Sequence, residues 1–417
     1  MSPRRLDMRI LCKYGAPIGS TLRSWPTLPL VVRFDSDARP KSNHLPRNVE
    51  VALRHPDRLC EIDLDLTNSM TGSIVEVIQK PCPALESIRI RVIDAKGPSI
   101  LVRNAFLGGS SPHLREIKLD GITFPFPEIR QILLSTNNLV ELRLSSIPNQ
   151  VYFSPEDLVT GLSTLVQLKR LTVDFHSPNS RSPPIMTRPP LRRTTLPSLR
   201  FLEFHGATEY LEEFVARIDS PALSTIHIML FNDILFEIPQ FCGFIPRLNT
   251  PQSLTSATVI LDSKSVGVSF IHETNPGKGC YTFRNSCIPL DWKLSFVTQI
   301  TSQLSPLLSS MRELTITGDS SLEVPTGEEG VDLTQWLELF QPFTRVTKVD
   351  VLEKQVVPGI VQALVMDDIA AGVLPELTTL HLEGYIGTPY VAKAAEEFVA
   401  TRRDLGRTVN LLSLDYF

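Results

Sequence analysis

Paired cysteines, long apolar runs and a large excess of one charge are all absent from this 417-residue sequence. Its six cysteines form no C-x-x-C pair, so we expect neither a disulfide framework nor a cysteine-rich metal site. The longest apolar stretch, residues 226–241, contains Asn232, Asp233 and Glu237, which make it too polar and too short to cross a bilayer. A net charge of −4 gives no reason to expect a nucleic acid or an anionic membrane as a partner.

Sequence motifs of catalysis and cofactor binding are also missing. The chain has no G-x-x-x-x-G-K-[ST], no G-x-G-x-x-G after a strand and no H-E-x-x-H, and its eight histidines do not pair at metal-ligand spacing. Residues 317–321, TGDSS, resemble the Gly-Asp-Ser of some esterases, but no Asp-x-x-His follows late in the chain. We therefore expect no enzyme, no cofactor and no bound metal.

Signals for export are not found either. The N-terminal stretch MSPRRLDMRILCKYG is basic but lacks the apolar core of about 7–15 residues that a signal peptide needs. No N-x-S/T glycosylation site with a permissive middle residue occurs. Unpaired cysteines are ordinary in a reducing compartment. These features favour the cytoplasm or the nucleus.

One pattern of apolar residues recurs along the chain. In its clearest copy Leu114, Ile117 and Leu119 are apolar, at positions called here L, L+3 and L+5, and the residues between them are charged. Such alternation predicts a β-strand with one buried face. The first seven steps between copies are 24 to 31 residues long, and this spacing with an L-x-x-L-x-L core is typical of leucine-rich repeats. The copies begin at Leu59, Leu85, Leu114, Leu139, Leu168, Leu199, Leu223, Leu254, Met311, Val346 and Leu377.

Helical periodicity occupies the segments between these strands. Apolar residues spaced by three and four predict helices at 71–80, 127–136, 154–165, 207–218 and 390–404. Ser154 and Pro155 form a typical helix start. Strand followed by helix, repeated, predicts an α/β leucine-rich-repeat solenoid, with a curved parallel sheet inside and helices outside. The repeats are degenerate, because no copy has Asn or Cys at L+8, and we expect an irregular arc.

We expect one continuous solenoid with four stretches. Residues 262–293 contain two alternating runs around the turn sequence NPGKG, which predicts a β-hairpin. Residues 176–197 contain six prolines and predict a loop. The stretches are an N-terminal cap or first irregular repeat (1–50), a leucine-rich-repeat region (51–261), a hairpin and helix insertion or distorted repeat (262–310), and C-terminal repeats with a capping helix (311–417).

Alternation along each strand also predicts which side chains could face a partner. Residues at L+3 and L+5 point inward, so residues at L+2, L+4 and L+6 lie on the concave face of the sheet. In the early repeats these residues are charged and alternate in sign between neighbouring strands, which predicts cross-strand ion pairs. The expected pairs join Glu116, Lys118 and Asp120 to Arg89, Arg91 and Arg143.

The middle repeats place less charge at the same positions. Aromatic and methionine side chains on an exposed strand face are typical of protein-binding hot spots. The alternative is that the hairpin at 262–293 or the loop at 176–197 folds over these residues and covers them. The expected partner-binding residues are Phe201, Glu203, His205, His227, Met229 and Ile260.

The stretches SWPTLPLVVRF (24–34), ALRHPDRLCEIDLDL (52–66) and FLGGSSPHLREIKLDGITFP (106–125) carry a resemblance to one known family. That family is the F-box/leucine-rich-repeat-like proteins of mushroom-forming (basidiomycete) fungi. The likeness covers residues 3–250 well and the remainder more loosely. In that family an F-box, a small helical module that docks on the Skp-type adaptor of a cullin–RING ubiquitin ligase, precedes the Trp-Pro segment, and the repeats hold the substrate. Residues 152–184 and 196–233 match as well.

The resemblance implies an intracellular, non-enzymatic scaffold that recognises a protein substrate for ubiquitin ligation. The residues before Trp25 lack a Leu-Pro followed by apolar helices, so we expect the F-box to be absent, which leaves attachment to the Skp-type adaptor open. One alternative is an F-box-less remnant or truncated product without a ligase role. Another is a hydrolase or transferase hidden in the degenerate repeats. The protein partner on the concave face is left open by the sequence.

Overall fold

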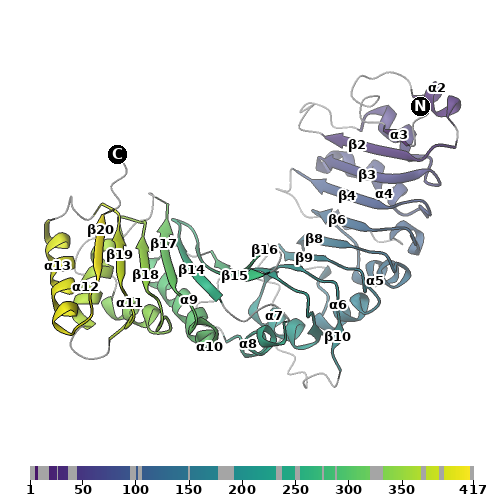
Figure 1. Ribbon diagram of the computed structural model, residues 1–417. Helices are drawn as coiled ribbons and strands as arrows, with labels where there is room; N and C mark the ends of the chain where they lie inside the picture. The colour runs from purple at the N-terminus through teal and green to yellow at the C-terminus, as the bar shows by residue number, and fades with distance from the viewer. Residues whose placement is uncertain are drawn as a thin grey trace. The chain divides into compact units, whose positions relative to one another are not determined.

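Figure 1 shows the computed structural model of the chain, which divides into two compact units, Met1–Leu223 (unit 1) and Ser224–Phe417 (unit 2). Most of the loop predicted at 176–197, part of the NPGKG turn and part of TGDSS lie outside the described residues. The structure describes residues 5–7, 18–25, 27–35, 45–93, 100–101, 106–148, 151–176, 192–231, 237–248, 254–274, 277–286, 289–319, 332–367, 372–384 and 389–413.

Unit 1 is built on a parallel sheet. Its strands follow one another in chain order, and each pair of neighbours is parallel. Four short strands form separate parallel pairs, β5 (Ile100–Leu101) with β7 (Ile122–Thr123) and β10 (Thr194–Thr195) with β12 (Ile218–Asp219). The main strands are β1 (Leu6–Asp7), β2 (Leu30–Asp35), β3 (Leu59–Leu66), β4 (Ser87–Val92), β6 (Glu116–Asp120), β8 (Glu141–Ile147), β9 (Arg170–Phe175) and β11 (Phe201–Gly206).

Helices connect the strands of unit 1. The start of α6 follows from its sequence: the Ser154 hydroxyl accepts a hydrogen bond from the backbone N–H of Asp157 at 3.0 Å, and Pro155 occupies a position that needs no N–H. The helical segments are α2 (Gly19–Ser24), α3 (Arg47–Leu53), η1 (Asn68–Met70), α4 (Thr71–Ile78), η2 (Phe106–Gly109), α5 (Phe126–Ser135), α6 (Pro155–Leu162) and α7 (Thr208–Ala216).

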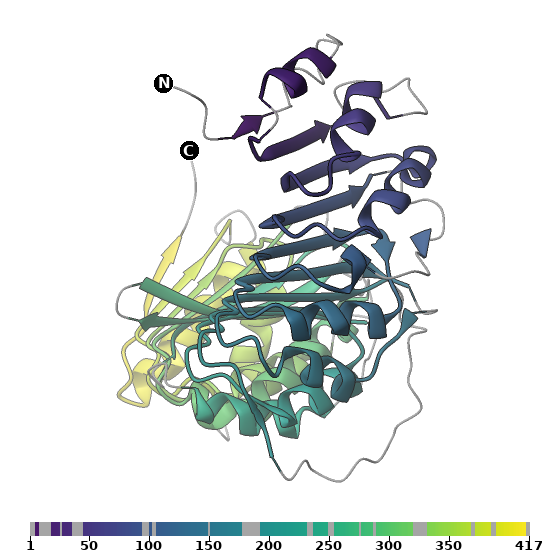
Figure 2. The ribbon, with the colours of Figure 1, turned by 90° about the vertical axis from the view of Figure 1, so that its right-hand side faces the viewer.

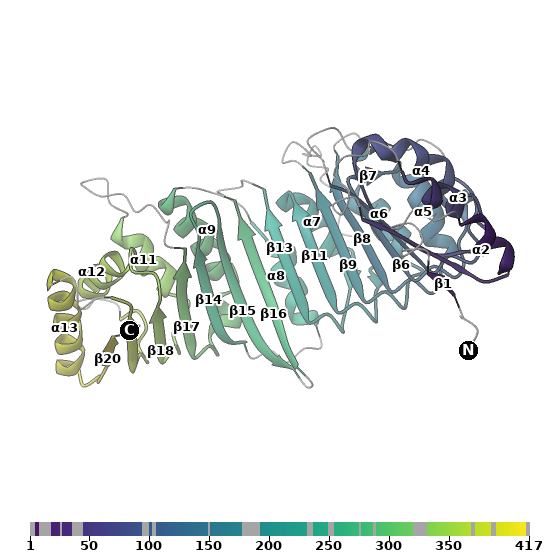
Figure 3. The same ribbon diagram turned by 90° about the horizontal axis from the view of Figure 1, so that it is seen from above.

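Strands and helices of unit 1 bury a common core. Leu114, Ile117 and Leu119 are at most 2% exposed, and β6 alternates buried with half-buried residues as the sequence predicts. Aromatic rings fill the space behind the sheet, where the ring centroids of Phe175 and Tyr210 are 4.9 Å apart. Figures 2 and 3 show helices α3–α7 on one face of this sheet. The opposite face is therefore formed by the remaining side chains of the strands.

Unit 2 has a mixed sheet whose order departs from chain order. Its strands lie in the order β13-β16-β15-β14-β17-β18-β19-β20. The strands are β13 (Thr225–Leu230), β14 (Leu254–Leu261), β15 (Val266–Thr274), β16 (Gly277–Asn285), β17 (Glu313–Gly318), β18 (Lys348–Val351), β19 (Thr379–Leu382) and β20 (Asn410–Ser413). The helical segments are α8 (Pro239–Phe244), η4 (Ile245–Arg247), α9 (Leu290–Gln303), α10 (Ser305–Leu308), α11 (Leu333–Phe340), α12 (Val357–Asp367) and α13 (Pro389–Asp404).

The predicted hairpin is confirmed as β15 and β16, which pair antiparallel from Val266 opposite Asn285 to Thr274 opposite Gly277. It lies within the sheet, because β16 pairs with β13 and β15 pairs with β14. The hairpin buries Phe270 and Phe283, at most 1% exposed, like the core residues of an ordinary strand. The alternative that this hairpin covers the sheet face is therefore wrong for its described residues.

The expectation of an α/β fold with a large, mostly parallel sheet is confirmed. The finer assignment to a leucine-rich-repeat solenoid, and the boundaries at 51, 262 and 311, stay predictions. None of the described helices is long and apolar enough to cross a membrane.

Candidate protein-binding surface

The face of the unit 1 sheet opposite the helices is called here the polar strand face, and it is formed by the residues at L+2, L+4 and L+6 and their equivalents on β2. Parallel pairing places equivalent residues of neighbouring strands side by side, about 4.8 Å apart, in rows that cross the strands. The middle row consists of Arg33, Asp63, Arg89, Lys118, Arg143, Thr172 and Glu203.

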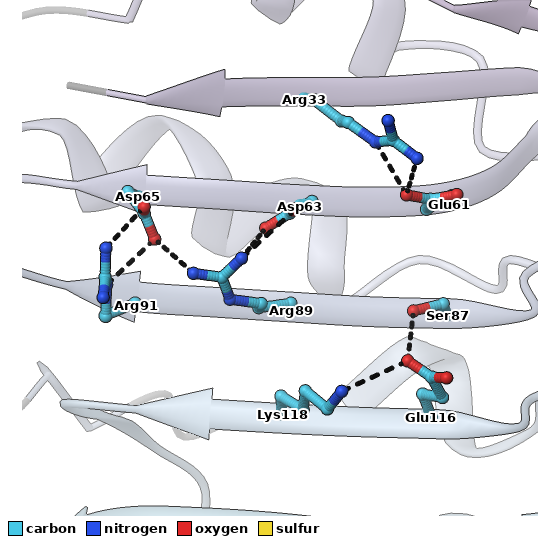
Figure 4. Close-up of polar contacts among 9 residues, drawn as sticks. All are labelled: Arg33, Glu61, Asp63, Asp65, Ser87, Arg89, Arg91, Glu116 and Lys118. Atoms are coloured by element: carbon cyan, nitrogen blue, oxygen red, sulfur yellow. Dashed lines mark hydrogen bonds and ion pairs between the residues drawn. The ribbon is translucent and has the colours of Figure 1, made fainter. Parts of the chain in front are cut away.

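Strands β2, β3 and β4 carry ion pairs on this face: one joins Arg33 to Glu61, and a separate group joins Asp63 and Asp65 to two arginines (Figure 4). Arg33 Nη2 lies 2.7 Å from Glu61 Oε1. Arg91 donates two hydrogen bonds to the carboxylate of Asp65, at 3.0 and 2.7 Å, and Arg89 donates a third at 3.4 Å. Asp65 is only 8% exposed, so these cations compensate for the water that its carboxylate has lost.

The neighbouring carboxyl group of Asp63 has a perturbed protonation equilibrium. Burial raises the pKa of Asp63 above its ordinary value, and the guanidinium of Arg89, 3.0 Å away, opposes this shift. Asp65 on the same strand adds to the increase because two negative charges repel.

The ion-pair partners predicted for the β6 strand from the sequence are wrong for Lys118. Lys118 Nζ lies 2.9 Å from Glu141 on the next strand and 3.4 Å from Glu116 on its own strand. Arg89 and Arg91, expected to pair with β6, form their ion pairs with β3 instead. The more buried carboxylates of β3 attract these cations more strongly, because less water screens them.

A bulge in β8 explains the other wrong assignment, of Asp120 with an arginine. Register between β8 and β9 shifts between Leu144 and Ile147, and Ser146 adopts a φ of +57°. The Ser146 hydroxyl then donates to Asp120 Oδ1 at 2.8 Å, so Asp120 is satisfied without a cation. Arg143 donates to Ser145 Oγ at 3.1 Å.

Three of the predicted partner-binding residues lie together on β11. The guanidinium of Arg170 sits 4.5 Å from the ring centroid of Phe201. His205 places Nδ1 3.3 Å from Asp174 and Nε2 3.6 Å from Glu203. These three residues are half-buried, and they offer a partner one aromatic surface beside several hydrogen-bonding groups.

The other three predicted residues are not all neighbours. His227 and Met229 lie together on β13, opposite Thr282 and Arg284 of β16. Ile260 lies on β14, and both strands of the hairpin separate it from β13. The repeat pattern predicted β13 and β14 as successive repeats and therefore as neighbouring strands. The hairpin lies between them in the sheet, so they are not neighbours.

Ligands for a metal ion do not gather among the residues that the structure describes: no group of three or more His, Cys, Asp or Glu side chains is placed to hold one. No disulfide joins the described cysteines Cys60, Cys82, Cys242 and Cys280. Burial raises the pKa of the Cys82 thiol to about 11, which opposes its use as a nucleophile.

Sequence reasoning missed a groove at the edge of the unit 1 sheet where the strands begin. Its volume is about 670 Å³, and it is lined by residues directly before or just after the first residue of each repeat. Only the L+2, L+4 and L+6 positions were considered as contact positions. Polar residues at L−1, such as His113, Asn138 and Gln167, were the signal that could have revealed it.

A scan against models of known protein families finds no match, and a search of the curated proteins finds none either. The class that the fold defines is an α/β protein with a large, mostly parallel sheet.

Proposed function

We propose that this chain is a non-enzymatic leucine-rich-repeat scaffold that binds a protein partner on its sheet face. The supporting observation is the one-sided cover of the unit 1 sheet. Parallel sheets are normally covered by helices on both faces. The described helices α3–α7 lie on one face, and no described helix of unit 1 lies on the polar strand face (Figure 3). Repeat proteins built from stacked strand–helix units use such a face for binding.

The proposed contact in unit 1 centres on Phe201, with Glu203 and His205 beside it. A half-buried aromatic ring is held by the cation of Arg170, so a partner could cover it without ordering a mobile side chain. The ion pairs on β2–β6 would give the rim of the contact its charge pattern and contribute little affinity. In unit 2 the proposed contacts are His227 and Met229, with Ile260 as a separate contact.

The wider role rests on the resemblance to F-box/leucine-rich-repeat-like proteins alone. It would make the chain a substrate-recognition part of a ubiquitin ligase. Co-purification with the Skp-type adaptor tests this role. If the adaptor is not enriched over a tag-only control, the proposed role in a ubiquitin ligase is wrong. A remnant without a ligase role, or a hydrolase within the repeats, is the alternative. Among the described residues, His205 has a carboxylate partner but no serine or cysteine nucleophile in a hydrogen bond.

The binding role is tested by quantitative affinity purification of the tagged full chain from its own cells. Phe201→Ala combined with Met229→Ala should remove a specific partner and leave the melting temperature nearly unchanged, since neither side chain is in the core. The control is Leu134→Ala, because Leu134 is 42% exposed on α5 in the helix layer. The proposal is wrong if the double variant keeps every partner that the control keeps.

A further inference from the structure

The groove at the strand-start edge of unit 1, called here the edge groove, is lined by residues one to three positions before β2, β4, β6, β8 and β9 and by Cys60, the second residue of β3. Backbone hydrogen bonds join its lining residues across neighbouring repeats: Arg115 N–H donates to Glu86 C=O at 2.7 Å, and Val140 N–H donates to Arg115 C=O at 2.7 Å. Five strand intervals of about 4.8 Å make it about 24 Å long, which fits an extended peptide of about seven residues.

Several polar side chains of the edge groove have no partner within the described chain. His113, Arg115, Asn138 and Gln167 are exposed, and their side chains form no hydrogen bond or ion pair with a described residue. This differs from the polar strand face, where Lys118 forms ion pairs with two glutamates. An amide side chain can both donate to and accept from a peptide backbone, as an extended ligand requires.

Arg115 is the one arginine or lysine that lines the edge groove, and its charge is not neutralised by the lining carboxylate, because that carboxylate pairs with a residue outside the lining. The one lining carboxylate, Glu86, accepts two hydrogen bonds from Arg5, both at 2.9 Å. Glu116 and Glu141, the first residues of β6 and β8, form ion pairs with Lys118. The guanidinium of Arg115 therefore has no counter-ion among the described residues, and His113 is beside it in the groove lining.

We propose that the edge groove binds an extended, acidic segment of a partner protein, with a carboxylate on Arg115 and backbone groups on Asn138 and Gln167. This inference rests on the proposed protein-binding function and gives it a second contact surface. A nucleic acid fits less well, because the groove lining contains no Phe, Tyr or Trp ring on which a base could stack and has one permanent cation, Arg115, for phosphates.

The test uses fluorescence anisotropy with four labelled probes at low salt. They are an octapeptide of alternating acidic and small apolar residues, its Gln/Asn version, its lysine version, and octathymidylate. The full chain should bind the acidic peptide at least tenfold more tightly than the other three. Arg115→Glu should raise the Kd for the acidic peptide about tenfold, because one attraction becomes a repulsion, and should strengthen binding of the lysine peptide. Arg143→Glu, on the polar strand face, is the matched control and should leave both values within twofold.

Four outcomes would overturn the inference: equal binding of the acidic and amide peptides, no binding of any probe, no gain of the lysine peptide by Arg115→Glu, or binding of octathymidylate as tight as that of the acidic peptide. Arg115→Ala, with its melting temperature, separates a loss of binding from a loss of folding. The Phe201 and Met229 variants keep the two proposals distinguishable. If those variants lose a partner while no peptide binds, the scaffold function stands and the edge groove fails.

Discussion

The ion pairs of Asp65 provide the most informative perturbation of unit 1. Asp65→Asn keeps the shape of the side chain and removes its charge. The wild-type carboxylate accepts three hydrogen bonds from Arg89 and Arg91, at 2.7 to 3.4 Å, and is 8% exposed. Hydrogen bonds to charged groups contribute about 1.5–3 kcal/mol each when well formed. Both arginines are partly exposed and the third bond is long, so we expect a total loss of about 2 kcal/mol.

Urea denaturation followed by circular dichroism measures this loss as a change in the free energy of unfolding. Glu116→Gln is the matched control: it is the same carboxylate-to-amide change on the same face, but the Glu116 side chain is 43% exposed and lies 3.4 Å from Lys118. The control should change stability by less than about 0.5 kcal/mol. If the two variants are equally stable, or if Asp65→Asn matches the wild type, the ion pairs of β3 and β4 do not hold this face together as described.

Three further predictions concern other parts of the chain. Phe283→Ala should destabilise the protein by about 3–5 kcal/mol in the same urea assay, because this hairpin residue is 1% exposed. Trp292→Ala is the control and should cost less than about 0.5 kcal/mol, because Trp292 is 45% exposed. Equal losses of stability would place the hairpin outside the core. Burial raises the pKa of Glu353 above its ordinary value, so the folded state disfavours its charged form and this group's contribution to stability is lost as pH rises through the folded pKa. Glu353→Gln should therefore raise the urea midpoint relative to the wild type at pH 7 and lose this advantage at pH 4, and an advantage independent of pH would contradict the assignment. The Cys82 thiol, with a pKa of about 11, should not react with maleimide at pH 8 in the native protein and should react fully in urea. Peptide mass spectrometry measures the labelling. Rapid labelling of the native protein would contradict the burial of this thiol.

The strands were predictable because one face of each is buried. Side chains alternate between the two faces of a strand, so Ile117 and Leu119 were assigned to the core from the sequence alone. Helix positions followed from period and capping. The helix predicted at 154–165 begins at Pro155 and ends at Leu162, since Ser154 caps its start and its end has no comparable signal.

The order of strands in unit 2 was not predictable in the same way. The alternating runs of residues 262–293 specified a hairpin, but alternation does not say which sheet edges the hairpin will meet. β15 and β16 pair on their outer edges with β14 and β13, and this long-range pairing separates Ile260 from Met229. Local sequence contains no signal for such a contact.

The sequence also did not predict which side chains form ion pairs with each other on the polar strand face. Register alone made Lys118 and Arg89 neighbours in one row, and the sign pattern indicated that ion pairs would form across strands. The choice of partner depends on burial: Arg89 turns to Asp63 and Asp65 on β3, and Lys118 turns to Glu141. Exposure differences of this kind appear only once the strands are packed.

Hydroxyl-radical footprinting of the full chain, alone and with its co-purified partner, is the most direct test of the proposed binding face. The aromatic ring of Phe201 and the exposed side chain of Leu134 both react with radicals and report on opposite faces of unit 1. The scaffold proposal predicts that partner binding reduces modification of Phe201 severalfold and leaves Leu134 unchanged. Protection of Leu134 with no change at Phe201 would show that the partner binds the helix layer and would contradict it.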